Sequence, residues 1–178
     1  ADPAVNYGGI GAVIGHEMSH QFDDQGAKYD LHGNLVDWWT PADAQQFQSR
    51  LDSLGAQFDA YEPLPGFHVQ GKLTMGENVA DLAGLTVAHD AYIASLNGAA
   101  PPVIDGQTAD QRFYLGWAQV WRRNYREPNL RQRILTDPHS PSPYRADIVR
   151  NMDPWYDAFK AQPGQKLYLA PADRVRIW

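Results

Sequence analysis

The stretch that decides the fold is His16-Glu17-Met18-Ser19-His20, near the start of the 178-residue chain. On a helix, residues four apart lie one turn apart on the same side, so both histidines point in one direction. Two imidazoles so placed can bind one metal ion, and Glu17 can reach a metal-bound water as a general base. The alternative is a pair of surface histidines on an exposed helix face. With 6 His and 4 Glu in the chain, chance would produce this pattern roughly 0.004 times.

Three glycines around this stretch share one helix face. Gly8, Gly11 and Gly15 recur at helical spacing within a helix predicted for residues 3–21. Each glycine costs a helix about 0.5–1 kcal/mol relative to alanine, so its presence needs a reason. We expect close backbone packing against another element on this face, and a pocket wall is the alternative.

Capping residues mark the beginnings of two further helices. Thr40 precedes Pro41, and Thr108 with Gln111 has the pattern of a capping box. Apolar residues then recur at intervals of three and four, as in an amphipathic helix. The predicted elements are helices at residues 3–21, 40–58, 76–96 and 108–125, a short strand at 67–70, short helical pieces after 125, and an extended tail at 168–178. The sequence therefore predicts a mainly α fold with little sheet.

The composition is that of a folded globular protein. Its residues are 43% hydrophobic and 20% charged, and no run approaches the ~18 apolar residues of a membrane span. We expect a single domain over residues 1–178. Because the chain has no cysteine, disulfides, thiol catalysis and cysteine-ligated zinc sites are excluded.

The net charge of −6 is unevenly distributed along the chain. Residues 1–89 hold 12 acidic and 3 basic residues, giving −9, whereas residues 90–178 hold 9 and 12, giving +3. This asymmetry indicates either a metal site that faces an anion-binding wall or two solvated faces. No basic stripe is interleaved with aromatic residues, so we expect no nucleic-acid partner.

A catalytic zinc ion needs a third protein ligand, and the chain has only four glutamates. Glu77 begins a predicted helix that is otherwise rich in apolar residues, so it is either the third ligand or a partner of the helix dipole. Asp81 lies four residues on, and two acids on one helix face repel each other unless a cation is near. Asp81 would then orient a ligand histidine, as Asp23 would, although Asp23 could equally be an ordinary loop acid.

These motifs resemble those of the neprilysin and endothelin-converting-enzyme family of zinc metallopeptidases. The stretches that carry the resemblance are HEMSHQFDDQG at 16–26, GENVAD at 76–81, VNYGGIG at 5–11, DPHSP at 137–141 and VRIW at 175–178. The resemblance implies the helical C-terminal part of a thermolysin-like zincin catalytic domain. Arg174 stands at or beside the position of a family cysteine, so the disulfide of animal members is absent, which points to a bacterial relative.

The resemblance also implies a role for each motif residue. His16, His20 and Glu77 would bind one Zn²⁺ ion, and Glu17 would activate the attacking water. The remaining implied roles are Asp81 orienting His16, Asp23 orienting His20, His139 donating to the oxyanion, Arg145 holding a substrate carbonyl, and Val13 and Trp121 lining the pocket for the residue after the scissile bond. A large apolar pocket there would favour cleavage on the amino side of hydrophobic residues.

The expected function is zinc-dependent hydrolysis of oligopeptides, and the alternatives are a folded non-catalytic fragment, a binding module or a structural zinc domain. Family members carry an N-terminal lobe and a substrate-binding edge strand that this chain lacks, so we expect the chain alone to be weakly active or inactive. Its expected partners are peptide substrates and that missing part. Uncovered apolar surface near Trp121 or the Gly8–Gly15 face would favour self-association. We expect an extracytoplasmic location in a bacterium.

Overall fold

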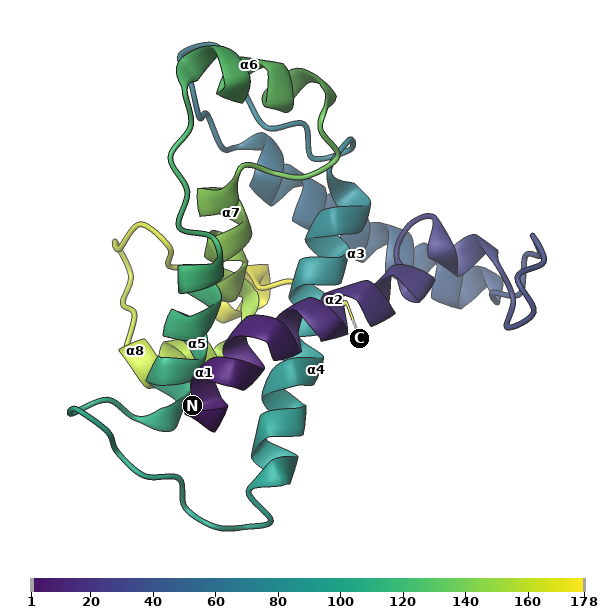
Figure 1. Ribbon diagram of the computed structural model, residues 1–178. Helices are drawn as coiled ribbons and strands as arrows, with labels where there is room; N and C mark the ends of the chain where they lie inside the picture. The colour runs from purple at the N-terminus through teal and green to yellow at the C-terminus, as the bar shows by residue number, and fades with distance from the viewer. Residues whose placement is uncertain (1, 178) are drawn as a thin grey trace.

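The computed structural model describes residues 2–177, and within them the chain is a helical assembly without a named strand. Figure 1 shows the first helical segments, residues 3–19, lying across α4 (Met75–Ser95), with α5, α7 and α8 on the left and α3 (Pro41–Asp59) passing behind α4 to the right. The elements are α1 (Pro3–Asn6), η1 (Tyr7–Gly11), α2 (Ala12–Ser19), η2 (His20–Phe22), η3 (Gly26–Lys28), α3 (Pro41–Asp59), α4 (Met75–Ser95), α5 (Ala109–Val120), α6 (Glu127–Thr136), α7 (Ser142–Ala146), η4 (Asp147–Asn151), α8 (Asp153–Phe159) and η5 (Pro171–Asp173). The mainly α prediction is confirmed.

The capping residues begin the helices where the sequence predicts them. Thr40 accepts a hydrogen bond from the backbone of Asp43 at the start of α3. Thr108 and Gln111 form the complete capping box of α5, with both reciprocal hydrogen bonds present. The strand predicted at 67–70 is wrong: only an isolated bridge between Leu64 and Phe67 forms there.

The predicted helix over 108–125 is too long at its C-terminal end. α5 ends at Val120, and Trp121 leaves the helical region of backbone conformation. Tyr125 lies beyond that end, and its hydroxyl contacts both the side chain and the backbone N–H of Ser142. A contact between residues 17 positions apart therefore competes with the extension of the helix.

The helix predicted over 3–21 is a single rod with an irregular middle. It consists of α1, the π-helical segment η1 and α2, and it ends in the 3₁₀ turn η2. The sequence pattern did not predict the π-helical turn. Such turns are rare inside α-helices and occur frequently at functional sites.

Two of the three glycines on this rod allow backbones to touch. A Cβ atom on Gly8 would lie 1.9 Å from the carbonyl oxygen of Phe113 in α5, and one on Gly15 would lie 2.5 Å from that of Gly84 in α4. Close packing is thus confirmed for both. Gly11 differs, because a Cβ there would make only ordinary contacts of 3.5 Å or more.

The core lies between α3, α4, α5 and the segments that follow residue 147. Its largest buried side chains include Trp117, Phe113, Phe58, Leu54, Leu85, Ile148 and Ile177. The tail returns to this core, as predicted: Val175 and Ile177 are buried, and Arg50 donates a hydrogen bond to the Ile177 carbonyl. Only η5 interrupts its extended course, and Trp178 of the VRIW motif lies outside the described residues.

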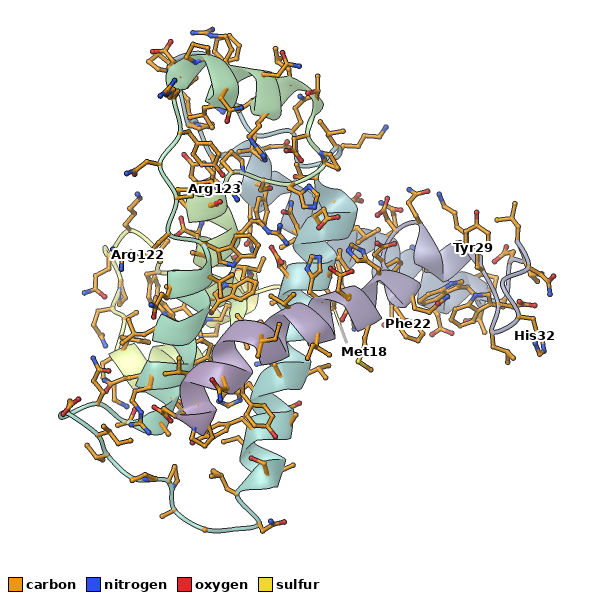
Figure 2. All side chains as sticks on the ribbon, in the orientation of Figure 1. Met18, Phe22, Tyr29, His32, Arg122 and Arg123 are labelled. Carbon is orange, nitrogen blue, oxygen red and sulfur yellow. The ribbon has the colours of Figure 1, made fainter. Side chains whose placement is uncertain are left out.

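The exposed apolar surface of the rod is not the glycine face. Gly8 and Gly15 are buried against α5 and α4, so the prediction of uncovered surface on their face is wrong. Instead Ile10, Ile14 and Met18, spaced four apart, are 62%, 55% and 66% exposed. Figure 2 labels Met18 on this rod, with Phe22 following it. Within residues 2–177, none of the helices has the length and apolar character that crossing a bilayer requires.

Candidate metal centre

The three predicted zinc ligands lie together where the rod crosses α4. Nε2 of His16 lies 3.1 Å from Oε2 of Glu77, and Nε2 of His20 lies 3.6 Å from Oε1 of Glu77. The two Nε2 atoms are 3.1 Å apart. One potential ligand atom from each residue therefore falls within 4.8 Å of the others, a group that could hold one metal ion.

The contact between Gly15 and Gly84 explains why these side chains meet. A Cβ on Gly84 would lie 2.2 Å from the backbone nitrogen of His16, so α4 touches the rod at the first histidine. Asp81 precedes Gly84 by three residues and Glu77 precedes it by seven, which places all three on one face of α4. The face that packs against α2 is therefore the face that carries both acids.

The donor set fits a catalytic zinc ion. Two imidazoles and one carboxylate form one of the ligand sets that leave a fourth position open. Oε2 of Glu77 is buried and has no hydrogen-bond partner among the described residues, although nitrogens of His16 and His139 lie 3.1 and 3.2 Å away. A buried carboxylate oxygen without a hydrogen bond is costly, and a bound cation would compensate for that cost.

The Nδ1 atom of each candidate ligand histidine lies beside a carboxylate. Nδ1 of His16 lies 2.8 Å from Asp81, and Nδ1 of His20 lies 2.7 Å from Asp23. Backbone N–H groups of Gln25 and Gly26 donate to the second oxygen of Asp23 and hold its carboxylate in place. Both pairs match the predicted orienting contacts, in which the acid fixes the ring and leaves Nε2 for the metal.

The acids favour positive charge at this point. Burial opposes protonation of His16, but the adjacent carboxylates of Asp81 and Glu77 outweigh it and raise the pKa of His16 to about 9. Burial would raise the pKa of the Glu77 carboxyl, but the neighbouring imidazoles of His16 and His139 lower it. The carboxylates around His16 thus favour the kind of positive charge that a divalent cation would supply.

Two predicted residues from the basic half of the chain reach this cluster. Nε2 of His139 lies 3.2 Å from Oε2 of Glu77. Nε and an Nη of Arg145 each donate to one oxygen of the buried Asp81, both at 2.7 Å. At this site, acidic side chains from the first half of the chain therefore face basic side chains from the second half.

Asp137 is a site residue that our sequence reasoning missed. Its Oδ1 accepts hydrogen bonds from the backbone N–H of His139, and Nδ1 of the same histidine lies 2.8 Å away. Its other oxygen accepts from Arg133. Burial acts to raise the pKa of the Asp137 carboxyl, but the two contacts with His139 lower it. The sequence signal that could have identified Asp137 is its position two residues before His139.

The remaining predicted site residues are less closely grouped. Glu17 is exposed on α2 beside His16, as a base that meets solvent would be.

Trp121 packs against Arg145, whose guanidinium carbon lies 3.9 Å from the centre of the Trp121 ring. Trp121 lines a cavity of about 540 Å³ together with Arg122 and Arg123. Figure 2 labels these two arginines where the chain leaves α5. The half-buried Val13 is not part of that cavity, so the structure does not bring the two predicted pocket residues together there.

A larger cavity lies beside the metal cluster rather than at it. It measures about 880 Å³, lies between α3 and the 24–39 segment, and includes Asp24 and Met75 in its walls. None of the three ligand residues lines it. Choosing the site by cavity volume alone would therefore miss the cluster of His16, His20 and Glu77.

Comparisons with known proteins agree with the motifs. The sequence profile described as peptidase family M13 matches residues 1–175. The chain is 42% identical over 163 residues to neprilysin-11 of Caenorhabditis elegans, covering 88% of this chain and 19% of that protein. It is 38% identical over 176 residues to neutral endopeptidase of Lactobacillus helveticus, covering 98% and 25%.

Solved structures give the same result. Zinc metalloprotease ZMP1 of Mycobacterium tuberculosis, crystallised with an inhibitor, superposes with a TM-score of 0.98 at 54% identity, covering 100% of this chain and 28% of that one. The chain thus spans about a quarter or less of the two curated relatives named above. Because the family profile matches almost every residue, the resemblance read from the motifs is confirmed, and the chain belongs to peptidase family M13.

Proposed function

We propose that this chain is the zinc-binding catalytic part of an endopeptidase that hydrolyses oligopeptides. The observation that carries the proposal is the meeting of His16, His20 and Glu77 within 4.8 Å, with the exposed Glu17 beside the first histidine. A structural zinc site needs no such base, and a binding module needs no open coordination position. Membership of a family of peptidases supports the same reaction class.

The chain's own residues would divide the work of hydrolysis as follows. Zinc, when bound by the three ligands, would supply Lewis acidity to polarise the scissile carbonyl and activate water. Glu17 would accept a proton from the attacking water and deliver it to the leaving amine. His139 would donate a hydrogen bond to the developing oxyanion. Arg145, held rigidly by Asp81, would donate to a backbone carbonyl of the substrate.

The proposed specificity is cleavage on the amino side of hydrophobic residues. Its support is the aromatic surface of Trp121 next to Arg145 and the position of Val13 on the ligand-bearing helix. An apolar side chain seated there would leave water, at about 25 cal/mol for each Å² of surface it buries. Comparing peptides that differ only in the residue after the scissile bond tests this specificity.

We also propose that residues 1–178 form one domain that acts together with a further part of the protein. The relatives are much longer than this chain, which supports a partner lobe that aligns the peptide. Alignment can supply ~7–11 kcal/mol of a barrier, so the chain alone should cleave peptides weakly or not at all. The location outside the cytoplasm stays a prediction, which cell fractionation would test.

The decisive experiment uses the intact protein that contains this chain, loaded with zinc and assayed on a fluorogenic peptide. Glu17→Gln should keep the zinc content and lower kcat by ~10²–10⁴-fold, because general-base catalysis is worth that much. Loss of zinc together with activity would make Glu17 a ligand or a structural residue instead. An intact, zinc-loaded protein that cleaves no peptide would favour the alternative of a non-catalytic binding module. Equal kcat/KM for the isolated chain would refute the need for a second part.

A further inference from the structure

The residues that follow Glu77 and His139 in the sequence contact each other. The Oγ of Ser140 donates a hydrogen bond of 2.8 Å to Oδ1 of Asn78. Asn78 is 0% exposed and Ser140 is 3% exposed. A buried hydrogen bond therefore joins the first turn of α4, which carries the proposed carboxylate ligand, to the loop that carries His139.

The amide of Asn78 is held on both sides, so its orientation is determined. Its Nδ2 donates to Oγ1 of the buried Thr74 at 2.9 Å. The hydroxyl of Thr74 in turn donates to the carbonyl of Gln70 at 3.1 Å, so it is an acceptor toward Asn78. Oδ1 of Asn78 is thereby left to face Ser140. A buried network with its partners present specifies one arrangement of the groups it joins.

The loop that contains His139 needs support of this kind. It is bordered by Pro138 and Pro141, which have no backbone N–H to donate. The side chain of His139 is 44% exposed, so packing does little to immobilise it. Asp137 contacts Nδ1 of the ring and fixes its rotation, whereas the hydroxyl of Ser140 ties the loop itself to α4.

We propose that Asn78 and Ser140 are positioning residues that hold His139 at its working distance from the carboxylate ligand Glu77. Nε2 of His139 lies 3.2 Å from Oε2 of Glu77, and the link between the two neighbouring residues sets the separation of their backbones. The proposal rests on the proposed function, in which His139 stabilises the oxyanion. A displacement of about 1 Å at such a group can cost on the order of 100-fold in rate.

The test is Ser140→Ala in the intact, zinc-loaded protein. We expect kcat to fall between about 10-fold and 100-fold, with KM and zinc content nearly unchanged. Asn78→Ala should lower kcat to a similar degree, and the double variant should be no worse than the more severe single one, because both remove one link. Thr86→Ala is the matched control: it removes a hydroxyl that bonds to the Leu82 carbonyl on the same helix, and kcat should be unchanged.

The background His139→Ala separates positioning from a merely structural role. If Ser140 acts through His139, adding Ser140→Ala to that background should not lower kcat further. An equal loss in both backgrounds, or a Ser140→Ala protein with parental kcat, would overturn the proposal. The function proposed above would stand in either case.

A crystal structure of the Ser140→Ala protein gives a readout independent of activity. We expect Nε2 of His139 to move away from Glu77 by about 1 Å, the displacement considered above. If the intact protein binds zinc but cleaves no peptide, the proposed function fails. The distance between His139 and Glu77 in the variant structure still tests whether Ser140 positions His139. A His139 that keeps its 3.2 Å distance from Glu77 without the serine hydroxyl would refute it.

Discussion

The crossing of α2 with α4 and the segment from α6 to α7 contribute to the same site by different means. At the crossing, regular helices and glycine contacts place His16 and Glu77 through backbone geometry. In the second segment, Arg145 and Ser140, the neighbour of His139, make side-chain hydrogen bonds to residues more than 60 positions away. The comparison teaches that the ligand group is built into the helix packing, whereas the proposed oxyanion side depends on a few individual polar contacts.

The largest expected effect comes from removing the acid that joins the two regions. Asp81 is buried, contacts His16 and accepts hydrogen bonds from Nε and one Nη of the buried Arg145. Asp81→Ala should lower the free energy of unfolding by about 3–5 kcal/mol, because it leaves a buried charge without its partner. Chemical denaturation measures this loss.

A matched control is Asp110→Ala. Asp110 also pairs with a buried histidine, His89, but its own side chain is 39% exposed. Its removal should cost about 1 kcal/mol or less. Equal losses for the two variants would show that Asp81 is no more important to the structure than an ordinary half-exposed acid.

The proposed oxyanion side should be separable from the metal-binding side. His139→Ala in the intact protein should keep zinc and raise the barrier by ~2.7–4 kcal/mol, as loss of one oxyanion donor does. His16→Ala should instead lose both zinc and activity. Metal analysis alongside kcat distinguishes the two results. Zinc loss from the His139 variant, or a parental kcat, would contradict the assignment.

The glycine contact offers a smaller, purely steric test of the crossing. Gly84→Ala places a methyl group 2.2 Å from the His16 backbone nitrogen, so the helices must move apart. We expect a loss of about 1–3 kcal/mol in stability, typical of overpacking, together with weaker zinc binding. Gly9→Ala is the control, because its Cβ would lie 3.8 Å from Val120, an ordinary contact. Unchanged zinc affinity in Gly84→Ala would show that the close contact does not set the ligand positions.

The smallest effect is expected on the solvent side of the rod. Ile14→Ser replaces one residue of the exposed stripe that also contains Ile10 and Met18. Stability should change by less than about 0.5 kcal/mol, as at most surface positions. Self-association of the isolated chain, measured by analytical ultracentrifugation, should weaken because the apolar patch is smaller. Unaltered association would place the contact elsewhere, with Trp121 the next surface to test.

Local pattern was enough to predict much of the ligand group. The spacing of His16 and His20 is a property of one helix, and Glu77 was the glutamate at the start of an otherwise apolar helix. Asp81 and Asp23, the acids predicted to orient the histidines, lie within four residues of a candidate ligand in sequence, and the structure makes both contacts. The predicted roles of His139 and Arg145 came from the family resemblance, because no periodicity or spacing in their own segment distinguishes them.

The sequence by itself determined the helices, their caps and the residues able to bind a metal, since each depends on neighbours within a turn or two. Tertiary structure alone decided where α5 ends, which face of the rod is exposed, and the link between Asn78 and Ser140. Those features depend on contacts between residues far apart in the chain. A pattern of period 3.6 identifies the apolar face of a helix, but it carries no information about which distant residues pack against that face.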